Sequence, residues 1–104
     1  MKKVKNYEIY NLVKQIVRII RRYIPDKNYK IYLYGSWMKG NALPNSDIDI
    51  AIYGQTEVAA LIMIKIKDEI ENLPTLRSID LIDLNLVSEN FKVSILQKGE
   101  KVDG

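Results

Sequence analysis

Two aspartates interrupt an otherwise apolar run, and they constrain the fold more than any other feature of the sequence. The run from residue 47 to 53 predicts a β-strand, so Asp47 and Asp49 point to the same face of a sheet. Like charges about 5–7 Å apart repel each other, and strands disfavour aspartate. A divalent cation removes this conflict, and carboxylate oxygens with open positions for water and phosphate suit Mg²⁺.

A short segment upstream predicts an anion site. The apolar run 31–34 is typical of a strand that ends at Gly35 and Ser36, and Gly40 follows five residues after Gly35. We expect a short helix over 37–42 and a turn over 43–46, with the first helix amides facing an anion. The glycine spacing matches neither the dinucleotide-binding fingerprint nor the P-loop. An anion cradle beside a carboxylate pair is what a nucleoside triphosphate requires.

A third carboxylate, Asp80, lies in an apolar stretch over 76–84 that predicts another strand. A lone buried aspartate there would be costly. Asp80 is therefore either solvated at an edge, hydrogen-bonded at the strand start, or a third ligand beside the first two, and the upstream pair favours the ligand. Asp83 is its rival, because residues 80 and 83 face opposite sides of a regular strand.

Apolar residues at helical spacing predict three further helices. The first runs from Tyr7 to Ile24, after a frayed polar lead over 1–6, and ends before Pro25. The second begins at an N-cap formed by Thr56 and ends before Pro74. Its expected buried stripe comprises Val58, Leu61, Ile62, Ile66, Ile70 and Leu73. The last has Ser88 as N-cap, Gly99 as its stop, Phe91 and Ile95 inward, and a tail or short strand over 100–104.

Composition limits the available chemistry. The 104 residues, 47% of them hydrophobic, predict a single α/β (α+β) domain over 1–104. Histidine and cysteine are absent, which excludes Ser-His-Asp and Cys-His catalysis and thiolate or imidazole metal ligands in this chain. The net charge of +3 makes nucleic acid an unlikely partner. Without a membrane-length apolar run or signal-like start, we expect a cytoplasmic protein with no membrane partner.

The basic side of the first predicted helix allows two interpretations. Lys14, Arg18, Arg21 and Arg22 lie opposite its apolar residues. We favour a solvated helix face, and the alternative is a docking surface for an acidic partner.

The loop and carboxylates together resemble a known family. Gly35-Ser36-x-x-x-Gly40, followed by Ser46-Asp47-Ile48-Asp49, is similar to the motif of the DNA polymerase β-like nucleotidyltransferases, and most of all to the minimal nucleotidyltransferase (MNT) proteins. Trp37 and Lys39 stand where arginine is frequent in that family. The resemblance implies a small mixed sheet packed with helices and favours Asp80 over Asp83, which we expect at the strand end or on the surface. It implies catalytic and metal-binding roles for Asp47, Asp49 and Asp80, and nucleotide binding by Gly35, Ser36, Lys39, Gly40 and Ser46.

The same resemblance implies a function. MNT proteins are commonly antitoxins of helical HEPN toxins, and some transfer AMP from ATP to a tyrosine of that partner. We therefore expect an ATP-dependent adenylyltransferase that uses two Mg²⁺ ions. One alternative is a binding module, with little or no activity, that neutralises a partner by contact. Another is a small-molecule nucleotidyltransferase that needs a separate acceptor-binding subunit. A homo-oligomer is compatible with the sequence.

Overall fold

The computed structural model describes residues 1, 4–40, 42–43 and 46–104, and its elements follow the predicted order. The helices are α1 (Tyr7–Tyr23), α2 (Ser36–Lys39), α3 (Ala60–Glu71) and α4 (Glu89–Lys98), with a 3₁₀ turn η1 (Leu84–Leu86). The strands are β1 (Lys30–Tyr34), β2 (Ile48–Tyr53), β3 (Ile79–Asp83) and β4 (Glu100–Asp103). Among these described residues, no helix has both the length and the apolar character needed to cross a bilayer.

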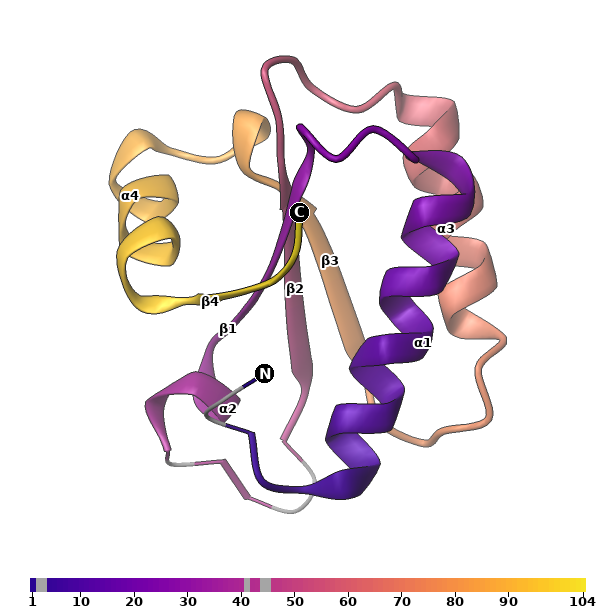
Figure 1. Cartoon of the computed structure of the whole chain (residues 1–104), viewed down its shortest axis with the longest axis vertical. Coiled ribbons are helices and arrows are strands. Elements are labelled where there is room, and N and C mark those ends of the chain that lie inside the picture. The colour runs from indigo at the N-terminus through magenta and orange to yellow at the C-terminus, as the bar shows by residue number, and fades with distance from the viewer. Residues whose placement is uncertain (2–3, 41, 44–45) are drawn as a thin grey trace.

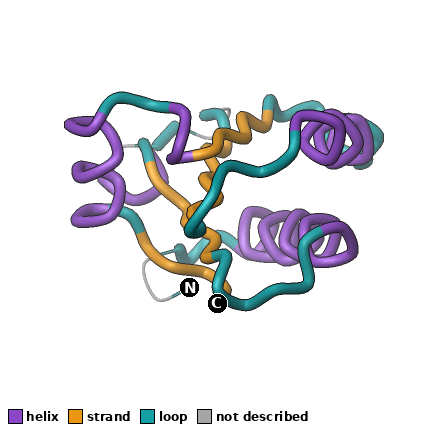
Figure 2. The backbone as a smooth tube through the Cα atoms, turned by 90° about the horizontal axis from the view of Figure 1, so that it is seen from above, coloured by secondary structure: helices purple, strands orange, loops and turns teal. Residues whose placement is uncertain are grey.

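The strands of the described residues form one mixed sheet in the order β3-β2-β1-β4. Strand β1 pairs antiparallel with β2 and β4, whereas β2 and β3 run parallel. The parallel pair requires a crossover, which α3 supplies. Helices α1 and α3 cover one face of the sheet and α4 covers the other (Figures 1 and 2). This mixed sheet between two helical layers confirms the predicted α/β class.

Strand alternation gives the sheet one predominantly apolar face and one face where a smaller hydrophobic cluster lies beside polar side chains. Ile48, Ile50 and Ile52 of β2 are fully buried in the core beneath α1 and α3. The residues between them, Asp49 and Ala51, face α4 because successive side chains point to opposite sides. Full burial of each isoleucine contributes about 1.5–3 kcal/mol. The apolar face thus stabilises a sheet whose other face carries a carboxylate.

Helix α1 confirms its predicted limits. The Asn6 side chain caps it by accepting hydrogen bonds from the amides of Glu8 (2.9 Å) and Ile9 (3.3 Å). The predicted frayed lead is wrong at the described positions, because Val4 is buried and the amino group of Met1 lies 3.3 Å from the carboxylate of Glu100. Positions 2 and 3 of that lead lie outside the described residues.

Part of the basic side of α1 is used within the chain. Arg21 forms an ion pair of 2.5 Å with Asp103 of β4, and Arg22 forms one of 2.6 Å with Glu69 of α3. These contacts join α1 to both neighbouring elements. Only Arg21 is thereby largely covered, whereas Lys14, Arg18 and Arg22 are exposed, as expected of a solvated helix face.

Helix α3 starts three residues later than predicted. Its N-cap is Ala59, and the hydroxyl of Thr56 instead lies 2.8 Å from that of Tyr29. Val58, Ile66 and Ile70 are buried as predicted, whereas Leu61 is 61% exposed and Met63 is buried instead. The late start of α3 has a tertiary cause. The carboxylate of Asp83 accepts a 2.7 Å hydrogen bond from the amide of Val58 and holds this segment outside the helix.

Strand β3 is shorter than predicted. It begins at Ile79, and Leu76 is fully exposed. Asp83 lies at the strand end, as expected, but it is buried rather than on the surface. Besides the amide of Val58, its carboxylate accepts a 2.9 Å hydrogen bond from the amide of Asn85 and so caps η1. Two amides satisfy this buried acid and make it a structural residue.

Helix α4 confirms its predicted ends. The hydroxyl of Ser88 accepts a 3.2 Å hydrogen bond from the amide of Phe91, and the helix ends at Gly99. Ile95 is buried as predicted, whereas Phe91 is 44% exposed and contacts Tyr34 edge to face at 6.0 Å between ring centroids. The predicted short strand is β4.

The buried carboxylate of Asp83 gives a first test. Asp83→Ala should lower the free energy of unfolding by about 3 kcal/mol, since it leaves the amides of Val58 and Asn85 without their acceptor. Urea denaturation measures the change. Asp68→Ala, on the exposed side of α3, is the matched control and should change stability by less than about 0.5 kcal/mol. Equal effects of the two variants would contradict a structural role for Asp83.

Candidate functional site

A row of polar side chains crosses the face of the sheet that α4 partly covers. Asp49 of β2 is directly paired with Tyr34 of β1 on one side and with Asp80 of β3 on the other. Asp47 immediately precedes β2, two residues from Asp49. Asp49 is half-buried, and Asp47 and Asp80 are exposed. The register therefore brings the predicted third acid next to the predicted pair, as the sequence suggested.

The three acids of this row have no counter-charge in the part of the chain that the structure describes. No cation or amide there pairs with Asp47, Asp49 or Asp80. The carboxylates at two other strand ends do have partners, since Asp83 accepts hydrogen bonds from two amides and Asp103 binds both Arg21 and Lys27. The row is thus an unbalanced negative surface on a scaffold that otherwise pairs its strand-end carboxylates.

The electrostatics of the row reflect this imbalance. Burial raises the pKa of the Asp49 carboxyl, and the charges of Asp80 and Asp47 raise it further. The pKa of the Tyr34 hydroxyl is also raised well above its ordinary range, first by burial and then by the charges of Asp49 and Asp80. Tyr34 therefore keeps its proton at neutral pH, and Asp49 carries its charge at an energetic cost.

This donor set fits a hard cation. Among the described residues, no group of three or more acids, histidines or cysteines is placed to hold a metal ion, so Asp47, Asp49 and Asp80 do not by themselves form a three-ligand cage. Mg²⁺ does not need such a cage, because it retains several waters and is bound through one or two carboxylates together with substrate phosphates. A bound cation would favour the charged form of Asp49, which burial and the neighbouring acids disfavour.

The loop before α2 lies directly against the acid row. Gly35 has φ +82°, and a Cβ atom added there would lie 2.3 Å from an oxygen of Asp49. Only glycine allows both the backbone conformation and the close approach. The carbonyl of Gly35 accepts hydrogen bonds from the amides of Met38 (2.9 Å) and Lys39 (3.1 Å), which forms the turn that starts α2. Ser36, the predicted phosphate ligand, follows in the first turn.

Helix α2 is shorter than the predicted helix over 37–42. It ends at Lys39, with Gly40 in the left-handed conformation at φ +76°. Position 41 of that helix and positions 44 and 45 of the predicted turn lie outside the described residues. The hydroxyl of Ser46, another predicted nucleotide ligand, accepts a 2.8 Å hydrogen bond from the amide of Leu43. Ser46 therefore fixes the connection into β2.

Arg77 and Trp37 form a clamp that the sequence did not reveal. The guanidinium of Arg77 lies 5.5 Å from the ring centroid of Trp37 and is paired with Glu8 at 2.6 Å. Both Trp37 and Arg77 donate hydrogen bonds of 3.4 Å to the carbonyl of Ser46. The clamp ties α2 to the starts of β2 and β3. A lone arginine before a strand carries no signal of this role.

A hollow of about 500 Å³ lies between α2 and α4, next to the row. It shares Tyr34 and Gly35 with the row, and its remaining lining comes from α2, α4 and Gly99. Its polar side chains are those of Lys39, Ser94, Gln97 and Lys98. The negative row is therefore continuous with a cavity that carries positive charge.

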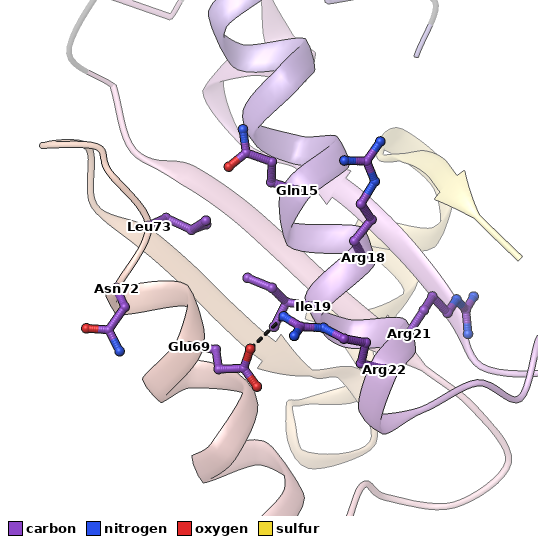
Figure 3. A pocket seen from close by; sticks show the side chains of 8 residues that line it. All are labelled: Gln15, Arg18, Ile19, Arg21, Arg22, Glu69, Asn72 and Leu73. Carbon is purple, nitrogen blue, oxygen red and sulfur yellow. Dashed lines mark hydrogen bonds and ion pairs between the residues drawn. The ribbon is translucent and has the colours of Figure 1, made fainter.

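A larger hollow, of about 840 Å³, lies on the opposite face of the sheet between α1 and α3. Figure 3 shows Arg22 reaching Glu69 across it, while Arg18 extends away from this pair. Glu69 also accepts a hydrogen bond from the hydroxyl of Tyr23. The one carboxylate that lines this hollow, that of Glu69, is thus already paired.

The loop, the acid row and the mixed sheet together define a nucleotidyltransferase fold of the polymerase β type. The chain belongs to the family described as "Polymerase beta, Nucleotidyltransferase", which matches residues 6–102. The match confirms the resemblance drawn from the Gly-Ser and Asp-x-Asp motifs.

Relatives extend this assignment. A Haemophilus influenzae protein named "Probable protein adenylyltransferase MntA" is 30% identical over 74 residues, which are 71% of this chain and 63% of that protein. The match thus spans less than two thirds of that relative. A chain of a crystal structure described as a toxin–antitoxin with AMP-PNP has a TM-score of 0.69 at 27% identity, covering 88% of this chain and 72% of that one.

A third match concerns the fold alone. It is a chain from the complex of a tri-AMPylated Shewanella oneidensis HEPN toxin with an MNT antitoxin, with a TM-score of 0.68 at 23% identity, covering 91% of this chain and 71% of that one.

The contact between Gly35 and Asp49 gives a second prediction. Gly35→Ala should lower the free energy of unfolding by about 3 kcal/mol, because backbone strain adds to the clash with the carboxylate. Gly40→Ala is the matched control, with a similar φ but open space around the added Cβ, and should cost about 1 kcal/mol. Urea denaturation measures both variants.

A double-mutant cycle isolates the clash. Asp49→Ala removes the atoms that the new methyl group meets, so it should restore part of the stability lost in Gly35→Ala and none of that lost in Gly40→Ala. Strict additivity in both cycles would show that Gly35 does not touch the carboxylate in solution.

Proposed function

We propose that the chain transfers AMP from ATP to a hydroxyl acceptor. The observation that carries this proposal is the row of Asp47, Asp49 and Asp80, three acids without counter-charge beside the Gly35 loop. Membership of the nucleotidyltransferase family supports the reaction class. The relative named as a probable protein adenylyltransferase supports ATP as donor and a protein as acceptor.

The residues divide the work between substrate and metal. The loop at Gly35 and Ser36 holds the phosphates, with Lys39 supplying positive charge at the end of α2, and Gly40 and Ser46 shape the loop on either side. Mg²⁺ ions, two in the complete site, would be held by Asp47, Asp49 and Asp80. Such ions neutralise phosphate charge and lower the pKa of an attacking hydroxyl.

The transfer itself is an in-line displacement. The acceptor oxygen forms a bond to the α-phosphorus, and the bond from that phosphorus to the oxygen bridging to the β-phosphate breaks. Pyrophosphate leaves with the bonding electron pair, and Asp80, exposed at the sheet edge, takes the hydroxyl proton. Positioning and charge neutralisation provide the rate enhancement, so a chain without histidine can perform it.

The acceptor we propose is a tyrosine of a HEPN-type toxin, which makes the chain the antitoxin of the pair. The MNT resemblance implies this partner. The structural relative that is a toxin–antitoxin bound to AMP-PNP supports both an assembly with a toxin and an adenine nucleotide in the site.

A transfer assay tests the reaction. With ATP and Mg²⁺, a co-expressed HEPN partner should gain about 329 Da per transferred AMP. Asp49→Asn should reduce the rate at least about 100-fold, and Asp68→Asn on α3 should leave it unchanged. The readout is intact-protein mass spectrometry of the partner.

The alternatives predict other results. Neutralisation of the toxin without a mass change, with no nucleotide-dependent change in Trp37 fluorescence, would indicate a binding module. Nucleotide binding with transfer only to a small molecule would indicate a small-molecule nucleotidyltransferase that needs a separate acceptor-binding subunit.

The raised pKa of Asp49 gives a stability test that needs no partner. The folded chain holds this proton more tightly than the unfolded chain does, so the free energy of unfolding should fall as pH rises from 3.8 through the raised pKa and then level off. Asp49→Asn should remove this fall and be more stable than the parent at pH 7 without metal. Urea denaturation across pH 3.5–7 measures both effects.

Mg²⁺ should raise the stability of the parent chain, as removal of the Asp49 charge should. It binds the folded chain and should raise the melting temperature of the parent but not of Asp49→Asn. A parent whose melting temperature does not respond to Mg²⁺ would argue against a shared metal site.

A further inference from the structure

The hollow between α2 and α4 has two walls, and each carries a lysine. Lys39 stands on the α2 wall and Lys98 on the α4 wall, with Tyr34 and Gly35 between them. Gly35 also touches Asp49, so the acid row leads directly into the hollow. A polyanion with its metal-bound end on the acids would therefore place its far end between the two lysines.

The strand order gives the direction of that polyanion. From β3 through β2 to β1, the row runs from Asp80 to Asp49 and then to Tyr34 and the Gly35 loop. Helix α4 packs on the same face of the sheet, against β1 and, through Ile95, against Ala51 of β2. If the α-phosphate lies at the acids, where the reaction of the proposed function occurs, the β- and γ-phosphates extend past Gly35 toward α4.

The charges of the chain favour the same assignment. The negative charges of a triphosphate and of the three acids together exceed the positive charge of two Mg²⁺ ions and one lysine. In the described residues, Arg21, Arg22, Lys27, Arg77 and Lys92 each pair with a carboxylate. Neither Lys39 nor Lys98 does, and both are exposed. The two cations that line the hollow are thus available to an anion.

Helix α4 is held firmly enough to position a ligand. A Cβ atom at Gly99 would lie 2.7 Å from the carbonyl of Ile95 and 3.1 Å from that of Leu33, so the end of α4 packs tightly on β1. The ring of Phe91 contacts Tyr34, and Ile95 is buried. Lys98 therefore projects from a fixed backbone rather than from a loose tail.

We propose that Lys98 binds the β- and γ-phosphates of the nucleoside triphosphate opposite Lys39, so that α4 forms the second wall of the nucleotide site. The inference rests on the proposed function and adds a phosphate ligand outside the Gly-Ser and Asp-x-Asp motifs. It also explains how a chain with lysine at position 39 grips a triphosphate, since two ammonium groups share the charge.

Calorimetric titration with ATP and with inorganic triphosphate, both with Mg²⁺, tests the proposal. Lys98→Gln should weaken both ligands about tenfold, because a charge-assisted contact to phosphate is lost. Lys98→Arg should stay within about threefold of the parent, since it restores the charge. Lys101→Gln, an exposed lysine of β4 outside the hollow, is the charge-matched control and should bind as the parent does. Equal urea midpoints show that the variants are folded.

Each other outcome has a definite meaning. Parent-like affinity of Lys98→Gln for ATP would overturn the role of Lys98 and leave the proposed function intact. A lower affinity of Lys98→Gln for ATP but not for inorganic triphosphate would show that Lys98 contacts the base or ribose, and would also overturn its role in phosphate binding. A parent chain that binds neither ligand would overturn the proposed function itself, and this inference with it.

Discussion

Repulsion among three carboxylates on one sheet face is the constraint to which the rest of this structure is fitted. Asp49 is half-buried and is flanked in register by Asp80, and its pKa is raised first by burial and then by the charges of Asp80 and Asp47. The described part of the chain offers these acids no counter-charge, so their repulsion lowers the stability of the fold. Burial of three isoleucines on the opposite face of the same strand offsets this loss.

This division depends on register. Because side chains alternate along a strand, a slip of β2 by one residue would turn Asp49 into the core and the isoleucines toward solvent. The clamp of Trp37 and Arg77 on the carbonyl of Ser46 fixes the start of β2 and opposes such a slip. The same clamp holds α2 and the Gly35 loop against the acids. Fold stability and site geometry are therefore set by one group of contacts.

Local patterns predicted the parts of the site that local chemistry determines. The spacing of Asp47 and Asp49, the glycine before Ser36 and the caps at Ser88 and Gly99 require nothing beyond alternation, backbone freedom and end signals. The family match agrees with that motif-based view.

Features that depend on distant partners could not be predicted in this way. The late start of α3 follows from a hydrogen bond between Asp83 and Val58, which are 25 residues apart. Arg77 pairs with Glu8, which lies 69 residues away in the sequence, and no pattern near either residue predicts the pair. The hollow beside the loop joins β1 and α2 to α4, so no single stretch of sequence contains it.

The position of β1 within the sheet affects how the chain is made. Strand β1 pairs with β2, which follows it closely, and also with β4 at the far end of the described chain. During synthesis the acid row leaves the ribosome before α4 and β4 do. Until then one edge of β1 is unpaired, and the cavity beside Gly35 has a single wall. A nascent chain thus carries its negative surface before it has the pocket that completes it.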